Sequence, residues 1–134
     1  QENPKYNNVV DDIFEYLEGR IKLCETHRID ASLLIADPGI GFGKILEHNL
    51  LIFRNIKKFQ DLGVPLLLGA SRKSFIAALS SDEPPHDRIS GSVAAALYGY
   101  SQGVNVFRVH DVAETVQALK VYEAISPNDY LADS

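Results

Sequence analysis

Charged and polar side chains lie at the C-terminal ends of three apolar segments of this sequence. Asp37 comes after the first segment, Ser71 and Lys73 come after the second, and Arg108 and His110 close the third. A carboxylate can accept a pair of hydrogen bonds from an amidine-like or guanidine-like edge, and cationic side chains can hold an oxyanion such as phosphate. These residue types indicate a site for a polar small molecule, provided that the fold brings the three segments together.

The third segment combines an arginine and a histidine with a predicted helix start at Asp111. In a strand, residues two apart share a face, so Arg108 and His110 point the same way. An isolated buried charge is costly, and Arg108 therefore needs a partner. Arginine, histidine and a helix N-terminus together could seat an oxyanion. The alternative is a structural ion pair between Arg108 and a neighbouring carboxylate, and this segment alone does not decide between the two.

The second segment ends in Ser71-Arg72-Lys73. A lysine at the end of a strand can present a compact charged donor to a site. The alternative interpretation is that Arg72 and Lys73 form a solvated pair on a loop.

A glycine-rich loop runs from Asp37 to Lys44. A Walker A loop would need Gly in place of Pro38 and Ser or Thr in place of Ile45, and a dinucleotide fingerprint beginning at Gly39 would need Gly in place of Lys44. Both patterns fail. What remains is a carboxylate followed by a loop whose backbone can approach a ligand closely.

Two side chains of this loop leave alternatives open. Asp37 could instead cap the loop by accepting hydrogen bonds from nearby backbone amides. Phe42 could stack on a ligand ring, but we expect it to plug the top of the fold.

The elements that must position these residues alternate regularly. A helix is predicted over residues 9–28, followed by three strand–helix units. The predicted strands are 32–36, 64–68 and 104–109, and the remaining predicted helices are 45–62, 74–79, 92–102 and 111–125. Residues 80–85 are predicted to form a mobile loop, and Asp111 to Glu114 have capping-box spacing.

This alternation predicts a parallel sheet covered by helices, either a barrel or a doubly wound sheet. In both architectures the chemistry gathers where the strands end. The three polar sets are therefore expected on one rim.

Composition limits the functional classes. The 134 residues are 46% hydrophobic and 23% charged, which is typical of one globular domain. A net charge of −5 argues against broad binding to nucleic acid or anionic membranes. The single cysteine, Cys24, excludes an internal disulfide, fits a reducing compartment and is expected to be packed. No spacing resembles a zinc site, and the absence of any Met suggests a piece of a longer chain.

Four motifs, in order and spacing, resemble the dihydropteroate synthase family: Asp37–Lys44, Gly69–Ile76, Gly91–Leu97 and Arg108–Thr115. The resemblance runs from about Asn8 to Ile125. It implies a TIM (β/α)8 barrel. It also implies a cytoplasmic transferase of folate biosynthesis and sulfonamide target, which joins 6-hydroxymethyl-7,8-dihydropterin pyrophosphate to 4-aminobenzoate and releases 7,8-dihydropteroate and pyrophosphate.

The resemblance also implies roles for the pterin and pyrophosphate side of the site. Asp37 resembles the residue that holds the pterin edge, and Lys73 the one that donates to the pterin ring and borders the aminobenzoate. Arg108 resembles the arginine that stacks on the pterin and, with His110, holds the pyrophosphate. Lys73, Arg108 and His110 form the implied catalytic set.

On the aminobenzoate side, Ser71 resembles a residue near the carboxylate and Phe42 one that packs against the ring, while Arg72 has a supporting role. Mg²⁺ is the implied cofactor, held mainly by the substrate pyrophosphate and by residues outside this chain, with no metal ligand inside it. A homodimer is implied, and neither nucleic acid nor membrane is an expected partner.

Three strands are fewer than the eight that such a barrel needs. We therefore expect residues 1–134 to be the C-terminal part of one pterin-binding barrel domain, supplying about the last three βα units. The missing N-terminal part is then a partner, with Gln1 to Pro4 resembling the end of the fifth strand–loop. An exposed strand edge and uncovered apolar helix faces should result.

Two other functions remain open. One is a pterin-binding methyltransferase domain, against which Ser71-Arg72-Lys73 favours the synthase. The other is a non-catalytic half-barrel paralogue, against which the intact Asp37, Lys73, Arg108 and His110 count.

Overall fold

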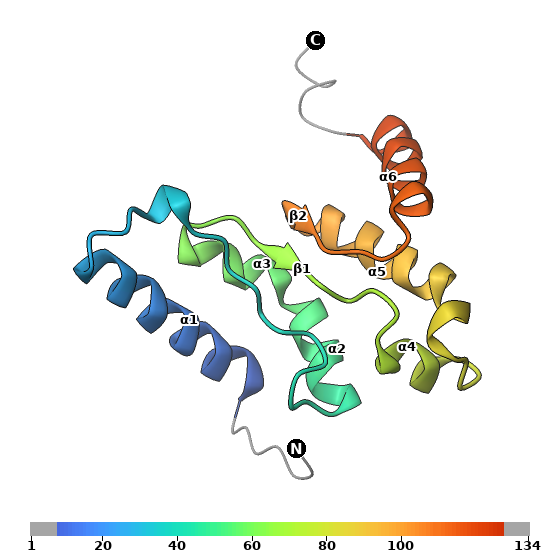
Figure 1. Cartoon of the computed structure of the whole chain (residues 1–134), viewed down its shortest axis with the longest axis horizontal. Helices are drawn as coiled ribbons and strands as arrows, with labels where there is room; N and C mark the ends of the chain where they lie inside the picture. Colours follow the sequence, from blue (N-terminus) through green and yellow to red (C-terminus); the bar gives the residue numbers. More distant parts are fainter. Residues whose placement is uncertain (1–7, 128–134) are drawn as a thin grey trace.

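The computed structural model describes residues 8–127, and it shows a leading helix followed by three βα units, the first of which has only a bridge at Ala36 in place of a full strand (Figure 1). The resemblance noted for Gln1 to Pro4 lies outside the described residues. In chain order the elements are α1 (Val9–Thr26), η1 (Ala31–Leu33), α2 (Leu46–Arg54), α3 (Ile56–Phe59), η2 (Gln60–Leu62), β1 (Leu67–Leu68), α4 (Ser74–Leu79), η3 (Pro85–Asp87), α5 (Ile89–Ser101), β2 (Val106–Phe107) and α6 (Val112–Ile125).

The strand segments are parallel, as the alternation predicts. Strand β1 pairs with β2, with Leu67 opposite Val106. On the other side of β1, Ala36 forms a parallel bridge with Leu66. The spatial order is therefore the Ala36 segment, β1 and β2, and the carboxyl ends of all three point to the same rim.

The first predicted strand is shorter than expected. Residues Ala31–Leu33 form a 3-10 turn, because the side chain of Asp30 accepts a hydrogen bond from Ser32 N at 2.8 Å and caps the turn. Only Ala36 of the predicted segment 32–36 pairs with a neighbouring strand.

The predicted helix over residues 45–62 is interrupted at Asn55. The backbone of Asn55 leaves helical geometry, with φ −119° and ψ 21°, and its side chain donates to Leu51 O at 2.8 Å. An Asn side chain that bonds local backbone competes with the helical ladder, and the segment divides into α2, α3 and η2.

The predicted mobile loop of residues 80–85 is organised around Glu83. The Glu83 carboxylate accepts hydrogen bonds from Ser80 Oγ at 2.6 Å and Ser81 N at 2.9 Å, and its carbonyl accepts one from Arg88 Nε at 2.7 Å. Helix α5 then begins at Ile89, three residues before the predicted start at Ser92.

The core lies between the strand segments and helices α1 to α5, with Ile40, Ile52 and Phe59 at its most buried positions. Apolar side chains are exposed beside the Ala36 edge, where Ile35 is 54% exposed, and on α6, where Ile125 is 76% exposed. The expected exposed edge and uncovered helix face are therefore both present.

Candidate functional site

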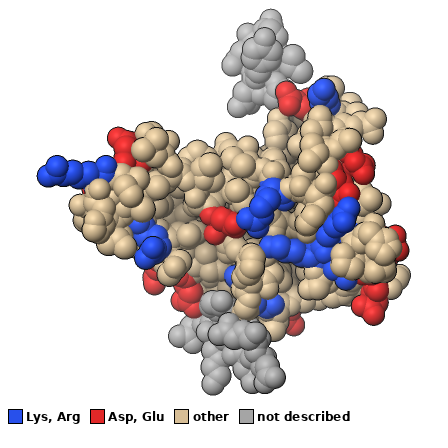
Figure 2. All heavy atoms as spheres, in the orientation of Figure 1, with Lys and Arg blue, Asp and Glu red and all other residues tan. Residues whose placement is uncertain are grey.

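The three strand ends bring the predicted site residues together. Asp37 follows Ala36, and Arg108 follows β2, where its backbone N–H donates to Leu68 O at 3.1 Å. The side chains meet across the rim, with Asp37 Oδ2 3.7 Å from Arg108 Nη1. Figure 2 shows basic side chains meeting acidic ones near the middle of this face, although the whole chain is acidic.

Asp37 caps the loop and also presents a carboxylate oxygen to the site, so both interpretations of its sequence position hold. One carboxylate oxygen, Oδ1, accepts a hydrogen bond from Gly39 N at 2.8 Å and caps the loop. The other oxygen faces Arg108. The ion pair that was the structural alternative for Arg108 therefore joins two candidate site residues. The Arg108 side chain is 58% exposed, so it lies at the strand end and not inside a buried strand as we expected.

A short network links Ser71 to His110. Ser71 Oγ lies 2.8 Å from Nδ1 of His110 and also accepts a hydrogen bond from the His110 backbone N–H at 3.1 Å. Because the hydroxyl accepts from the backbone, its own hydrogen can go to Nδ1, which leaves Nε2–H of the imidazole as a donor. Ser71 is buried, so this network fixes the ring.

A small hollow of about 120 Å³ lies at these strand ends and is lined by Gly69, Ser71, Lys73, Arg108, Val109 and His110. A Cβ atom at Gly69 would lie 2.9 Å from Arg108 Cζ and closer still to Nη2, so any side chain at this position would displace the guanidinium. The glycine lets the guanidinium lie against the backbone at the edge of the hollow.

Lys73 reaches from this hollow to the glycine-rich loop. Its Nζ donates to Ile40 O and lies 4.4 Å from the centre of the Phe42 ring, a cation–π contact. Burial lowers the pKa of Lys73, the charge of Arg108 lowers it further, and Asp37 acts in the opposite direction.

The expectation that Phe42 plugs the fold is wrong. Phe42 is 65% exposed, whereas Ile40 is 1% exposed and fills the core. The left-handed backbone at Gly39 and Gly41, with φ 77° and 90°, turns the loop between these side chains. Phe42 is thus an aromatic face presented to solvent beside a cation.

Two residues that hold the glycine-rich loop, one in the loop and one in α2, were missed by the sequence reasoning. Lys44 Nζ donates to Gly39 O at 2.7 Å and to Phe42 O at 2.8 Å, and burial lowers its pKa although Asp37 raises it. Asn49, which is buried in α2, accepts a hydrogen bond from Gly41 N at 2.8 Å. A polar residue on the buried face of a helix was the available signal for Asn49.

The capping box predicted at Asp111 does not form. Asp111 precedes α6 but makes no side-chain cap hydrogen bond. Its carboxylate instead accepts two hydrogen bonds from Arg72, at 3.1 Å from Nε and 2.6 Å from Nη2. A bidentate charge-assisted pair outcompetes a bond to a neutral backbone amide. Arg72 holds the pKa of Asp111 below its usual value.

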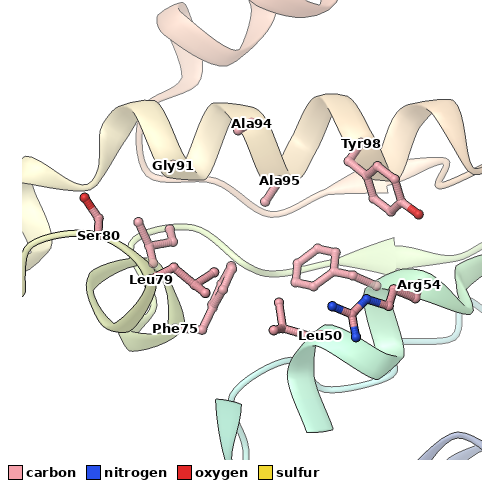
Figure 3. A pocket seen from close by; sticks show the side chains of 11 residues that line it. Leu50, Arg54, Phe75, Leu79, Ser80, Gly91, Ala94, Ala95 and Tyr98 are labelled. Atoms are coloured by element: carbon pink, nitrogen blue, oxygen red, sulfur yellow. The ribbon is translucent and has the colours of Figure 1, made fainter. Parts of the chain in front are cut away.

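A larger apolar hollow lies elsewhere, between helices α2, α4 and α5 (Figure 3). It has a volume of about 490 Å³, and Leu50, Phe75, Leu79 and Tyr98 are among its lining residues. None of the predicted site residues lines it, so its size does not make it the site of the chemistry.

Residues 8–127 contain no group of three His, Cys, Asp or Glu side chains placed to hold a metal ion. Within the same residues, no helix combines the length and apolar character needed to cross a membrane.

Parallel βα units with a carboxylate, a lysine, an arginine, an imidazole and a hollow at their strand ends define a parallel α/β protein with a polar ligand site on its rim. The family described as "Pterin binding enzyme" matches residues 1–110, and the chain belongs to this family.

Comparison with individual relatives also indicates this family. The chain is 44% identical over 131 residues to dihydropteroate synthase of Neisseria meningitidis, with 96% of the chain covered, and 44% identical over 124 residues to that of Escherichia coli, with 92% covered. It spans 46% and 44% of the lengths of these relatives.

Solved structures show the fold. A Yersinia pestis dihydropteroate synthase with a sulfonamide drug complex superimposes with a TM-score of 0.89 at 40% identity, covering 92% of this chain and 45% of that one. The Xanthomonas albilineans enzyme in complex with 7,8-dihydropteroate gives 0.89 at 42% identity, covering 92% and 49%. The chain therefore has the fold of part of a TIM barrel, as predicted.

Proposed function

We propose that the complete protein is a dihydropteroate synthase, to which this chain contributes the rim formed by Asp37, Lys73, Arg108 and His110. The observation that carries the proposal is the meeting of the Asp37 carboxylate with the Arg108 guanidinium at the strand ends of a pterin-family barrel. Relatives named dihydropteroate synthase at 44% identity support it.

Asp37 is proposed to bind the pterin. Its carboxylate is about a third exposed, and the oxygen that faces Arg108 is available to the donor edge of an aminopyrimidinone. Arg108 would then release the carboxylate and stack on the ring. Lys73, whose ammonium group bonds to Ile40 O at the edge of the same hollow, would donate to the pterin.

Arg108 and His110 are proposed to hold the pyrophosphate. Ser71 orients the imidazole so that Nε2–H can donate to an anion, and the guanidinium supplies a second donor. Phe42 would pack on the 4-aminobenzoate ring, with Ser71 at the edge of the same subsite and Arg72 behind it.

The proposed reaction is a displacement at the methylene carbon of the pterin. The aryl amine forms the new C–N bond and loses a proton, and the C–O bond to pyrophosphate breaks. Donors placed in advance at the leaving oxygen stabilise the charge that develops there. Mg²⁺ belongs to the proposal as a further neutraliser of pyrophosphate, but the described residues offer no metal site and no step above passes through it.

A homodimer in the cytoplasm completes the proposal. The apolar hollow between α2, α4 and α5 is a surface that a second copy could cover. The free thiol of Cys24 is compatible with the reducing environment of the cytoplasm. Sedimentation of the complete protein measures its oligomeric state.

Calorimetry with two ligands tests the function. In the complete protein, Asp37→Ala should abolish binding of both 6-hydroxymethyl-7,8-dihydropterin and its pyrophosphate. Arg108→Ala should weaken the pyrophosphate much more than the free pterin, and equal losses would contradict its assigned role. Product formation with 4-aminobenzoate, set against methyl transfer, separates the synthase from a pterin-binding methyltransferase. A complete protein that binds pterin and catalyses neither reaction would be a non-catalytic paralogue.

A further inference from the structure

We propose that Arg72 and Asp111 form a positioning pair that sets the register between the two segments of the pyrophosphate site. Arg72 lies between Ser71 and Lys73, and Asp111 directly follows His110. The bidentate pair therefore runs beside the Ser71–His110 hydrogen bonds and joins the same two segments a second time. The identity of the ligand, pyrophosphate, rests on the proposed function, whereas the geometry of the pair does not.

Arg72 is held on both its main chain and its side chain. Its backbone N–H donates to Ser92 Oγ at 2.8 Å, and its carbonyl accepts from Arg88 Nη1 at 2.8 Å. Its guanidinium spans the gap to Asp111, which is buried at the start of α6. Arg72 thus ties the end of β1 to α5 and to α6.

The backbone of Arg72 is left-handed, with φ 58°, a conformation that is strained for a residue other than glycine. The contacts around Arg72 maintain this conformation. This left-handed conformation turns Arg72 away from the rim hollow, which is lined by its neighbours Ser71 and Lys73 but not by Arg72. The guanidinium is therefore free to pair with Asp111 while its two neighbours face the ligand.

A positioning role and a purely electrostatic role give opposite results. If Asp111 acted only through its charge, replacing it with Asn would remove a negative charge near the anion and strengthen anion binding. If the pair sets the register, the same change should weaken binding. Arg72→Lys keeps the positive charge but loses the planar, bidentate guanidinium. A purely electrostatic role predicts unchanged anion binding in this variant, whereas a positioning role predicts weaker binding.

The experiment is calorimetry of inorganic pyrophosphate binding to the complete protein. We expect Asp111→Asn and Arg72→Lys each to weaken binding by about tenfold, since small misplacements of site groups carry large penalties. The exchange variant Arg72→Asp/Asp111→Arg should recover most of the loss, because Asp tolerates a positive φ. Unchanged or tighter binding by Asp111→Asn would overturn the proposal.

Asp11→Asn is the matched control, because Asp11 forms an ion pair with Lys58 between α1 and α3, away from the rim. It should leave pyrophosphate binding unchanged. Hydrogen exchange of the His110 amide, which donates to Ser71 Oγ, is a second measurement that needs no ligand. Faster exchange in Asp111→Asn but not in Asp11→Asn supports the pair, and equal exchange refutes it. If the unaltered protein fails to bind pyrophosphate, the anion role of Arg108 and His110 fails, while the exchange measurement still decides on the register.

Discussion

The Asp37 carboxylate and the Arg108 guanidinium lie 3.7 Å apart, between Oδ2 and Nη1, although they come from the first and third βα units. The pairing has two consequences. It aims the Asp37 carboxylate into the rim, and it holds the Arg108 guanidinium against Gly69 at the edge of the hollow. A ligand with both a donor edge and an anionic tail can engage the two groups at once.

Gly69→Ala should reduce the affinity for inorganic pyrophosphate without unfolding the protein. The new methyl group would displace the Arg108 guanidinium, which is the mobile end of an exposed side chain. We expect about a tenfold loss by calorimetry, since a displaced charge-assisted donor is worth roughly 1.5–3 kcal/mol. Gly19→Ala in α1 is the control, because a Cβ there meets nothing within 4 Å. An unchanged affinity in Gly69→Ala would remove Arg108 from the anion site.

Phe42→Ala should weaken 4-aminobenzoate binding while the melting temperature stays nearly constant. The ring is 65% exposed, so its removal leaves no cavity. Phe59→Ala is the contrasting variant, because Phe59 is fully buried and its truncation should cost about 3–5 kcal/mol. Calorimetry in the presence of pterin and thermal unfolding measure the two effects. A large drop in melting temperature for Phe42→Ala would mean that the ring has a structural role.

Lys73 should make pterin binding weaken at a lower alkaline pH than an ordinary lysine would. Burial, followed by the charge of Arg108, lowers its pKa from the usual 10.5, so the ammonium is lost early. Between the folded and unfolded pKa values the unfolded chain binds more protons, and the contribution of Lys73 to folding stability therefore rises with pH across this window. Pterin titrations between about pH 7 and 10.5 measure the loss of affinity.

Lys73→Arg provides the control for this pH dependence, because arginine stays protonated throughout. Its pterin affinity should be flat where that of the unaltered protein falls. Parallel curves for the two proteins would assign the titration to another group.

The Arg72–Asp111 pair should stabilise the protein down to unusually acidic pH. Arg72 lowers the pKa of Asp111 below 3.8, so the pair contributes stability above that value and loses it as the pH falls through the folded pKa. The difference in unfolding free energy between the unaltered protein and Asp111→Asn should be constant near neutrality and shrink below pH 3.8. Denaturant titrations measure it. In an Arg72→Gln background the acid dependence should vanish, and its persistence would exclude Arg72 as the cause.

Helix and strand order, the parallel sheet and membership of the rim were all predictable from the sequence. Unalternating apolar runs such as residues 64–68 indicate buried parallel strands. The residues that follow such strands must then share one edge, so Asp37, Lys73 and Arg108 could be placed together before any contact was known. These properties depend on periodicity and chain direction, which are local.

The partner of each polar group is determined by the tertiary structure. Asp111 has the spacing of a helix cap, yet it pairs with Arg72 from another βα unit. Phe42 and Ile40 are both apolar residues of one loop, and only the backbone turn at Gly41 determines that Ile40 is buried and Phe42 is exposed. Such outcomes depend on competition between local and distant partners for the same donors, acceptors and core volume. Sequence spacing does not record that competition, because the distant partner is brought near only when the chain folds.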